Sequence, residues 1–147
     1  MGRGNGGYTE KQASYKDSGG HKVIDKGAIF VAERYMDQGY EVVFRRDHNP
    51  DRGCDLTIKT SDDENFIKNI EVKAVTSPKS SKISDNIKKA KGQIKPGDTV
   101  AIYLPNHGNN EAGRAFAEAG IAEARRKGYV IGPIEVWFSD KTKITFD

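Results

Sequence analysis

The chain has 147 residues, of which 35% are hydrophobic, and this length and apolar content predict one folded domain and exclude a chain that is disordered throughout. Its 24 Lys and Arg residues against 21 Asp and Glu give a formal net charge of +3, too small to indicate a nucleic-acid binder unless the charge is concentrated on one surface. The single cysteine excludes an internal disulfide. Because no apolar run reaches the roughly 18 residues that a membrane span needs, we expect no membrane-spanning helix.

The N-terminal part combines a glycine-rich segment with a helical pattern. Residues 1–21 contain several glycines and scattered charges without a period, which predicts a flexible leader before a domain at 22–147. A helix follows, and Gly39 ends it after Gln38. Its apolar stripe at helical spacing consists of Ile24, Ala28, Val31 and Tyr35.

Strands and helices alternate through the rest of the chain. Apolar and β-branched runs predict strands, and the lysine-rich and alanine-rich runs predict helices. In chain order the expected elements are strands at 40–44, 55–60 and 66–75, a helix at 81–94, a strand at 98–104, a helix at 111–127 and a hairpin of strands at 133–138 and 143–146. This order predicts an α/β fold: a mixed central sheet flanked by helices, with a helix and a hairpin added at the C-terminus.

The stretch GCDLTIKTSDDENFIKNIEVKAV, residues 53–75, is predicted to form a hairpin with charged residues inside its strands. If its tip centres near Asp63, the numbers of opposed residues add up to 126, which places Asp55 across from Glu71. Side chains alternate along a strand, so Lys73 joins the same face, and facing Cβ atoms lie about 5 Å apart. A tip displaced by half a residue would break this pairing.

Two carboxylates in direct opposition destabilise a sheet, so we expect something to compensate for them. A divalent cation would do so, because hard cations prefer carboxylate oxygens and Mg²⁺ is held by one or two carboxylates together with water and phosphate. Lys73 would then orient or deprotonate a water molecule, or neutralise charge at phosphorus. The alternative is a solvated sheet face with a Glu–Lys ion pair that contributes little to stability.

Lysines are concentrated in the helix predicted at 81–94. From Lys79 to Lys95 the chain has six lysines and a single aspartate. The buried stripe of this helix is predicted to consist of Ile83, Ile87, Ala90 and Ile94. The lysines predicted to point outward, where they suit the phosphate backbone of a nucleic acid, are Lys88, Lys89 and Lys91. The alternative is a lysine face that contacts only solvent.

The pattern D-(x15)-E-V-K from Asp55 to Lys73 resembles the motif of the PD-(D/E)xK nuclease superfamily. A helix and a strand precede it and a helix and a strand follow it, and the resemblance extends from residue 22 to about 105. The context EVKAVTSPKSSKISDNIKKAKGQI, with DTVAIYL after it, is similar to the tRNase-type toxin domain at the C-terminus of contact-dependent growth inhibition proteins. The resemblance implies a restriction-endonuclease-like core.

The resemblance also implies a set of site residues. Asp55 and Glu71 would bind a divalent metal ion (Mg²⁺, Mn²⁺ or Zn²⁺), and Lys73 would act on the water. A glutamate on the first helix often joins these residues in the family, and Glu33 is the candidate in this chain, with a plain surface glutamate as the alternative. A polar residue of the lysine-rich helix, often a glutamine, lines the cleft in the resembling domains, which makes Gln93 a candidate.

The aspartate of the motif has one alternative. The literal Pro-Asp pair in this sequence is Pro50 and Asp51, in the polar turn at 45–53. Asp55 is preferred, because the apolar run begins directly after it and the hairpin register places it beside the E-V-K segment.

Taken together, the resemblance implies a metal-dependent endonuclease that cleaves tRNA. Such a domain is released from a secreted or cell-surface carrier, acts in the cytoplasm of a competing bacterium, and is neutralised by a cognate immunity protein in the producing cell. Two alternatives remain open: a DNA endonuclease of the same fold, of the restriction, junction-resolving or transposition type, and a non-enzymatic α/β interaction module.

Overall fold

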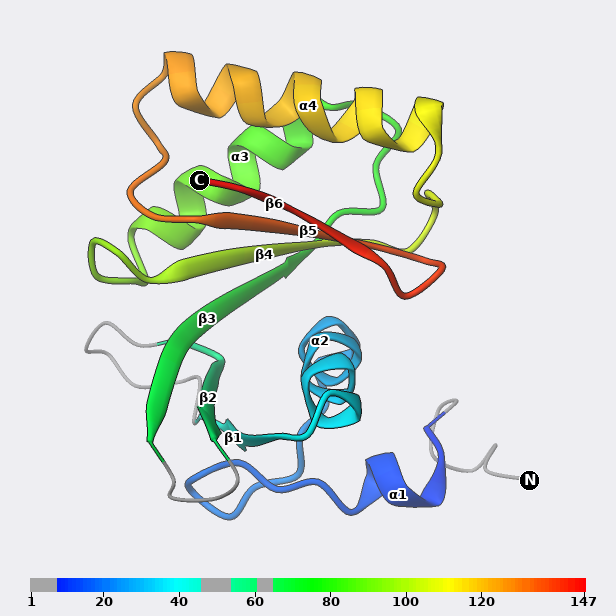
Figure 1. Cartoon of the computed structure of the whole chain (residues 1–147), viewed down its shortest axis with the longest axis vertical. Coiled ribbons are helices and arrows are strands. Elements are labelled where there is room, and N and C mark those ends of the chain that lie inside the picture. Colours follow the sequence, from blue (N-terminus) through cyan, green and yellow to red (C-terminus); the bar gives the residue numbers. More distant parts are fainter. Residues whose placement is uncertain (1–7, 46–53, 61–64) are drawn as a thin grey trace.

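The computed structural model describes residues 8–45, 54–60 and 65–147 (Figure 1). Its elements are α1 (Glu10–Ala13), α2 (Lys26–Asp37), β1 (Tyr40–Phe44), β2 (Leu56–Thr60), β3 (Phe66–Ala74), α3 (Ser81–Lys91), β4 (Thr99–Leu104), α4 (Glu111–Arg126), β5 (Ile134–Phe138) and β6 (Lys143–Phe146). The predicted fold class, a mixed sheet flanked by helices, is confirmed. The short helix α1 is an element that the sequence did not predict.

The six strands form one sheet in the order β1-β2-β3-β4-β5-β6. Strands β1, β2 and β3 pair antiparallel, β3, β4 and β5 pair parallel, and β5 and β6 pair antiparallel. The two parallel pairs require crossover connections, which α3 and α4 supply. Helix α2 covers one face of the sheet, and α3 and α4 cover the other (Figure 1).

Two apolar cores result, one on each face of the sheet. Residues of β2 and β3 that pack under α2 are Leu56, Ile58, Ile70 and Val72. On the other face, α3 and α4 pack over Val75 and over alternate residues of β4 and β5. The buried residues of α3 include the predicted Ile83, Ile87 and Ala90, with Ile94 buried just beyond the helix. The alternation predicted for the hairpin therefore sorts its apolar side chains correctly.

Helix α2 begins later than its apolar stripe predicts. Asp25 is the N-cap and accepts a hydrogen bond from the backbone N–H of Ala28 at 3.0 Å, as short polar residues at this position commonly do. Ile24 therefore precedes the helix and is 72% exposed, so its predicted place in the buried stripe is wrong. Gly39, with a φ of 93°, follows the end of the helix as predicted.

Residues 8–21 include the short helix α1 and make contacts with α2, and the flexible leader expected over 1–21 stays a prediction. In α1 the side chain of Thr9 caps the backbone N–H of Gln12, and Tyr8 and Tyr15 pack against the core under α2. The Tyr15 hydroxyl donates a hydrogen bond to Glu33 of α2 at 2.9 Å. Residues 1–7 lie outside the described residues.

Helices α3 and α4 pack closely because of one glycine. A Cβ atom on Gly120 of α4 would lie 2.5 Å from the Cβ of Ile83 and 2.7 Å from the carbonyl oxygen of Ser80. The contact between the two helices therefore depends on the missing side chain. No helix within the described ranges is both long enough and apolar enough to cross a membrane.

Candidate functional site

The register of β2 and β3 is the one predicted. Leu56 lies opposite Ile70 and Thr57 opposite Asn69, so the residue numbers add up to 126. The register shifts by one residue toward the tip of the hairpin, and residues 61–64 at the tip lie outside the described residues. Because the shift comes after the segment next to Asp55, the predicted arrangement at this end of the hairpin is preserved.

Asp55 lies at the point where β2 begins, and its side chain reaches β3. The backbone N–H of Asp55 donates to the carbonyl oxygen of Ile70 at 3.0 Å. Its Oδ2 accepts a hydrogen bond from the backbone N–H of Val72 at 2.8 Å. Strand β2 begins only at Leu56, so it offers no backbone partner for the N–H of Val72, and the Asp55 carboxylate takes that place. This hydrogen bond holds the Asp55 carboxylate near Glu71.

Glu71 and Lys73 lie on the same face of β3. Their partners on the parallel strand β4 are Val100 and Ile102, which belong to the core under α3 and α4. The Nζ of Lys73 is 3.3 Å from Oε2 of Glu71, and their side chains are 18% and 5% exposed. The structure therefore brings Asp55, Glu71 and Lys73 together, and the Glu–Lys pair is not on a solvated sheet surface.

The electrostatic surroundings of Glu71 penalise its charge. Burial and, next in size, repulsion by Asp55 raise the pKa of Glu71 from 4.5 to about 8, although Lys73 acts in the opposite direction. Asp25, at the N-terminus of α2, adds a smaller repulsion. A cation placed between the carboxylates would relieve this penalty.

The residues present fit a divalent metal ion of the magnesium type. Such an ion takes one or two carboxylates and completes its coordination with water and phosphate oxygens, and Asp55 and Glu71 provide two carboxylates close enough to repel each other. Within the described part of the chain, no group of three or more His, Cys, Asp or Glu residues is arranged to hold a metal ion. The site therefore offers a set of two carboxylates, and water or other oxygen ligands would have to fill the remaining positions.

Glu33 does not join this cluster. Its carboxylate accepts hydrogen bonds from Gln12 Nε2 at 3.0 Å and from the Tyr15 hydroxyl at 2.9 Å, so it faces the N-terminal segment. It also lies eight residues, about two helical turns, beyond Asp25 along α2. The helical carboxylate that acts on Glu71 is Asp25 instead.

Sequence reasoning missed the residues that surround Asp55 on the side of α2. A cavity of about 230 Å³ lies there, and its lining includes Asp17, His21, Asp25 and Arg45 together with Asp55. Asp25 is the N-cap of α2 in the structure, and no pattern in the sequence indicated that it would also lie near Asp55. His21 and Arg45 follow no spacing that would single them out. Asp51, the alternative to Asp55, lies outside the described residues.

The lysine-rich helix presents its lysines to solvent as predicted. The exposed residues are Lys88, Lys89 and Lys91. Two of them also make local contacts, because the Nζ of Lys88 lies 5.7 Å from the ring centre of Tyr129 and Lys91 donates to the carbonyl oxygen of Gly128 at 3.2 Å. Gln93 is exposed and lies two residues beyond the end of α3 rather than on it.

The chain matches no protein-family model, no curated protein and no solved structure. What the site does is therefore inferred from its own residues, from their arrangement and from the motif that they form.

Proposed function

We propose that the chain is a metal-dependent endonuclease that cleaves tRNA, with Asp55, Glu71 and Lys73 as its reacting groups. The observation that carries this proposal is the position of Glu71: this residue is 4% exposed, feels the charge of a second carboxylate and lies 3.3 Å from an ammonium group. A surface ion pair would not be buried in this way, so the alternative of a solvated sheet face loses its support.

A second buried glutamate shows what a structural carboxylate looks like in this protein. Glu135, which is 1% exposed, accepts hydrogen bonds from Lys68 Nζ at 2.8 Å and from Trp137 Nε1 at 3.0 Å, and the hydroxyl of Tyr35 donates as well. Burial alone would raise the pKa of Glu135, but its hydrogen bonds hold the pKa below the ordinary value. For Glu71, burial and the repulsion by Asp55 outweigh the stabilising effect of Lys73, so its pKa is raised. Strongly perturbed carboxyl groups of this kind are concentrated at functional sites.

Each residue of the cluster then has a defined part in phosphodiester hydrolysis. Asp55 and Glu71 would hold the metal ion, which supplies Lewis-acid stabilisation of phosphate oxygens and lowers the pKa of bound water. The ammonium group of Lys73 would orient the attacking water and offset the negative charge that develops at phosphorus. The hydrogen bond from the Val72 N–H fixes one oxygen of Asp55, which preorganises that carboxylate before substrate arrives.

The exposed lysines of α3 support a nucleic acid as the substrate. Helix α3 packs on the face of the sheet that also carries Glu71 and Lys73. Lys88 and Lys89 would bind phosphates of the substrate backbone, and this binding would weaken as salt concentration rises. The modest net charge of +3 fits a compact folded RNA better than a long duplex.

Delivery and neutralisation belong to the same proposal. The similarity of the segment from Glu71 to Leu104 to toxin domains of contact-dependent growth inhibition proteins supports a domain carried to the surface of one bacterium and acting in the cytoplasm of another. A cognate immunity protein would then protect the producing cell. The motif resemblance is the support for both statements.

The experiment is to incubate the purified chain with total tRNA and, in parallel, with plasmid DNA, in Mg²⁺, in Mn²⁺ and in EDTA. We expect cleavage of tRNA that requires the metal ion and that Glu71→Gln reduces by at least about a hundredfold, the size typical of losing a group that acts in the transition state. Glu118→Gln, on the exposed surface of α4, is the matched control and should retain full activity. Cleavage of DNA alone would identify the chain as a DNA endonuclease, and equal cleavage by the Glu71 variant would refute the proposed site.

A further inference from the structure

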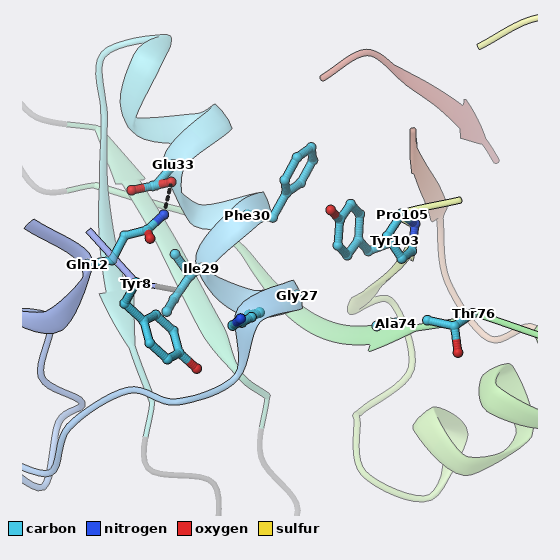
Figure 2. A pocket seen from close by; sticks show the side chains of 11 residues that line it. Tyr8, Gln12, Gly27, Ile29, Phe30, Glu33, Ala74, Thr76, Tyr103 and Pro105 are labelled. Carbon is cyan, nitrogen blue, oxygen red and sulfur yellow. Dashed lines mark hydrogen bonds between the residues drawn. The ribbon is translucent and has the colours of Figure 1, made fainter. Parts of the chain in front are cut away.

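A second cavity, separate from the one beside Asp55, lies between the N-terminal segment, α2 and the ends of β3 and β4 (Figure 2). Its volume is about 370 Å³, within the size range of sites that bind small organic groups. The lining residues that matter for its chemistry are Tyr8, Gln12, Phe30, Glu33 and Tyr103. None of them takes part in the phosphodiesterase chemistry proposed above.

Aromatic rings make up a large part of the wall. Phe30 of α2 and Tyr103 of β4 are stacked, with ring centres 4.2 Å apart and planes inclined by 21°. Tyr8, from the N-terminal segment, lines the cavity as well, and the Nζ of Lys26 lies 5.1 Å from its ring centre. All three rings are half-buried rather than enclosed in the core. Phe30 and Tyr103 cover one face of each other, and the Cζ of Arg34 lies 4.8 Å from the centre of the Phe30 ring. A planar ligand would therefore stack on the remaining surfaces of Tyr103 and Tyr8.

A fixed carboxylate provides the polar part of the same cavity. Gln12 Nε2 donates to Oε1 of Glu33 at 3.0 Å, as Figure 2 shows, and the Tyr15 hydroxyl donates to Oε2 at 2.9 Å. Each carboxylate oxygen therefore accepts one hydrogen bond from the protein, while a carboxylate has about four acceptor positions in all. Glu33 is thus held in a defined orientation and keeps the capacity to accept from a ligand.

The cavity lies close to the proposed site. Ala74, which lines it, directly follows Lys73 in β3. Gly27 of α2 also lines it, and a Cβ on Gly27 would lie 3.3 Å from Asp25 Oδ1 and 3.5 Å from the side chain of Ala74. Side chains of neighbouring strand residues point to opposite faces of the sheet, so Lys73 lies on the face under α3 and α4 while Ala74 lies on the face under α2. A nucleic-acid strand would reach both places by passing around the end of β3.

We propose that this cavity binds a guanine base of the substrate RNA, with the base against the aromatic rings and its Watson–Crick edge toward Glu33. Guanine offers two adjacent donors, N1–H and the N2 amino group, to the two oxygens of one carboxylate. Adenine and cytosine place a ring-nitrogen acceptor beside their amino group, and uracil flanks its single N–H with carbonyl oxygens, all of which a carboxylate repels. This inference rests on the proposed function, because it assigns a base preference to that nuclease.

Nucleotide binding without metal tests this inference independently of cleavage. In EDTA, the wild-type chain is titrated by calorimetry with GMP, IMP, AMP and CMP. We expect GMP to bind about tenfold or more tightly than the others, including IMP, which lacks only the N2 amino group, because a well-placed bidentate contact discriminates by at least that factor. Glu33→Gln should abolish the preference for GMP over IMP, Tyr103→Leu should weaken binding of every nucleotide, and Glu118→Gln should change neither.

The outcomes separate the two proposals. Selective GMP binding without any RNA cleavage would support the base site and refute the nuclease. Metal-dependent RNA cleavage with equal or undetectable binding of the four nucleotides would refute the base site and leave the nuclease standing. Binding of a small organic cation such as tetramethylammonium, with no nucleotide bound, would also overturn the assignment to guanine. Because the nucleotide panel uses the wild-type chain, the result does not depend on whether any variant folds.

Discussion

The Nζ of Lys73 lies 3.3 Å from Oε2 of Glu71, and both residues extend from the same face of β3 into a site where Glu71 is almost fully buried. This ammonium group does not fully compensate for the carboxyl group, because burial and the charge of Asp55 together raise the pKa of Glu71 to about 8. Ionising Glu71 is therefore costly for the metal-free fold, and the proposed metal site would give this cost a function.

The first prediction concerns the pH dependence of stability. The pKa of Glu71 is raised from 4.5 to about 8 in the folded protein, so between these pH values the folded state binds more protons than the unfolded state. Its contribution to the free energy of unfolding is fully present below pH 4.5 and is lost as pH rises toward 8. Thermal melts of the wild type and Glu71→Gln in EDTA should show the variant gaining relative stability across this window. A constant difference between the two would contradict the raised pKa.

The second prediction contrasts the two buried glutamates. Glu135→Gln removes a charge that Lys68, Tyr35 and Trp137 stabilise, and we expect it to destabilise the fold by about 3 kcal/mol or more. At pH 8, Glu71→Gln should have the opposite sign and stabilise the metal-free fold. Chemical denaturation of both variants measures the two signs directly. Equal destabilisation by both would mean that Glu71 is a structural residue like Glu135.

The third prediction tests the packing of α3 against α4. Gly120→Ala places a Cβ 2.5 Å from that of Ile83, and such overpacking costs about 1–3 kcal/mol. Gly92→Ala is the matched control, because its Cβ would meet only the carbonyl oxygen of Lys89 at 3.5 Å. Urea denaturation should show a loss of stability for the first variant and little change for the second. Two neutral variants would show that the helices are less tightly packed than described.

The fourth prediction concerns the lysines of α3. In a Glu71→Gln chain, which the proposed mechanism makes inactive, the double variant Lys88→Gln/Lys89→Gln should weaken RNA binding. It should also reduce the slope of log K against log salt by about 1 to 2, the effect of losing two phosphate contacts. Arg126→Gln, exposed at the end of α4, is the control for a general charge effect. Equal effects per charge removed would assign the binding to net charge rather than to this helix.

Much of the fold follows from local sequence patterns. Alternation and turn position set the register of β2 and β3, so the approach of Asp55 to Glu71 could be predicted before any coordinates. The exposed position of Ile24 could not be predicted, because helical spacing identifies an apolar stripe but not which residue becomes the N-cap. The docking of residues 8–21 on α2 depends on tertiary contacts of Tyr8 and Tyr15 that carry no periodic signal.

The candidate site was predictable in its strands and not on its helix. Glu71 and Lys73 lie on the same face of β3 because side chains two residues apart in a strand point the same way. The acidic residue supplied by α2 depends on how that helix is rotated and where it starts, and this places Asp25 rather than Glu33 near Glu71. The same rotation turns Glu33 toward Gln12 and Tyr15 and into the second cavity, where its role in base recognition is proposed.

The most direct test of the central claim is a titration of the purified chain with Mn²⁺, followed by electron paramagnetic resonance. The account predicts a divalent ion bound in the site that Asp55→Asn and Glu71→Gln each abolish, whereas Glu118→Gln retains it. Binding that is the same in all four proteins would show that the two carboxyl groups do not hold a metal ion together, and it would contradict the proposed nuclease.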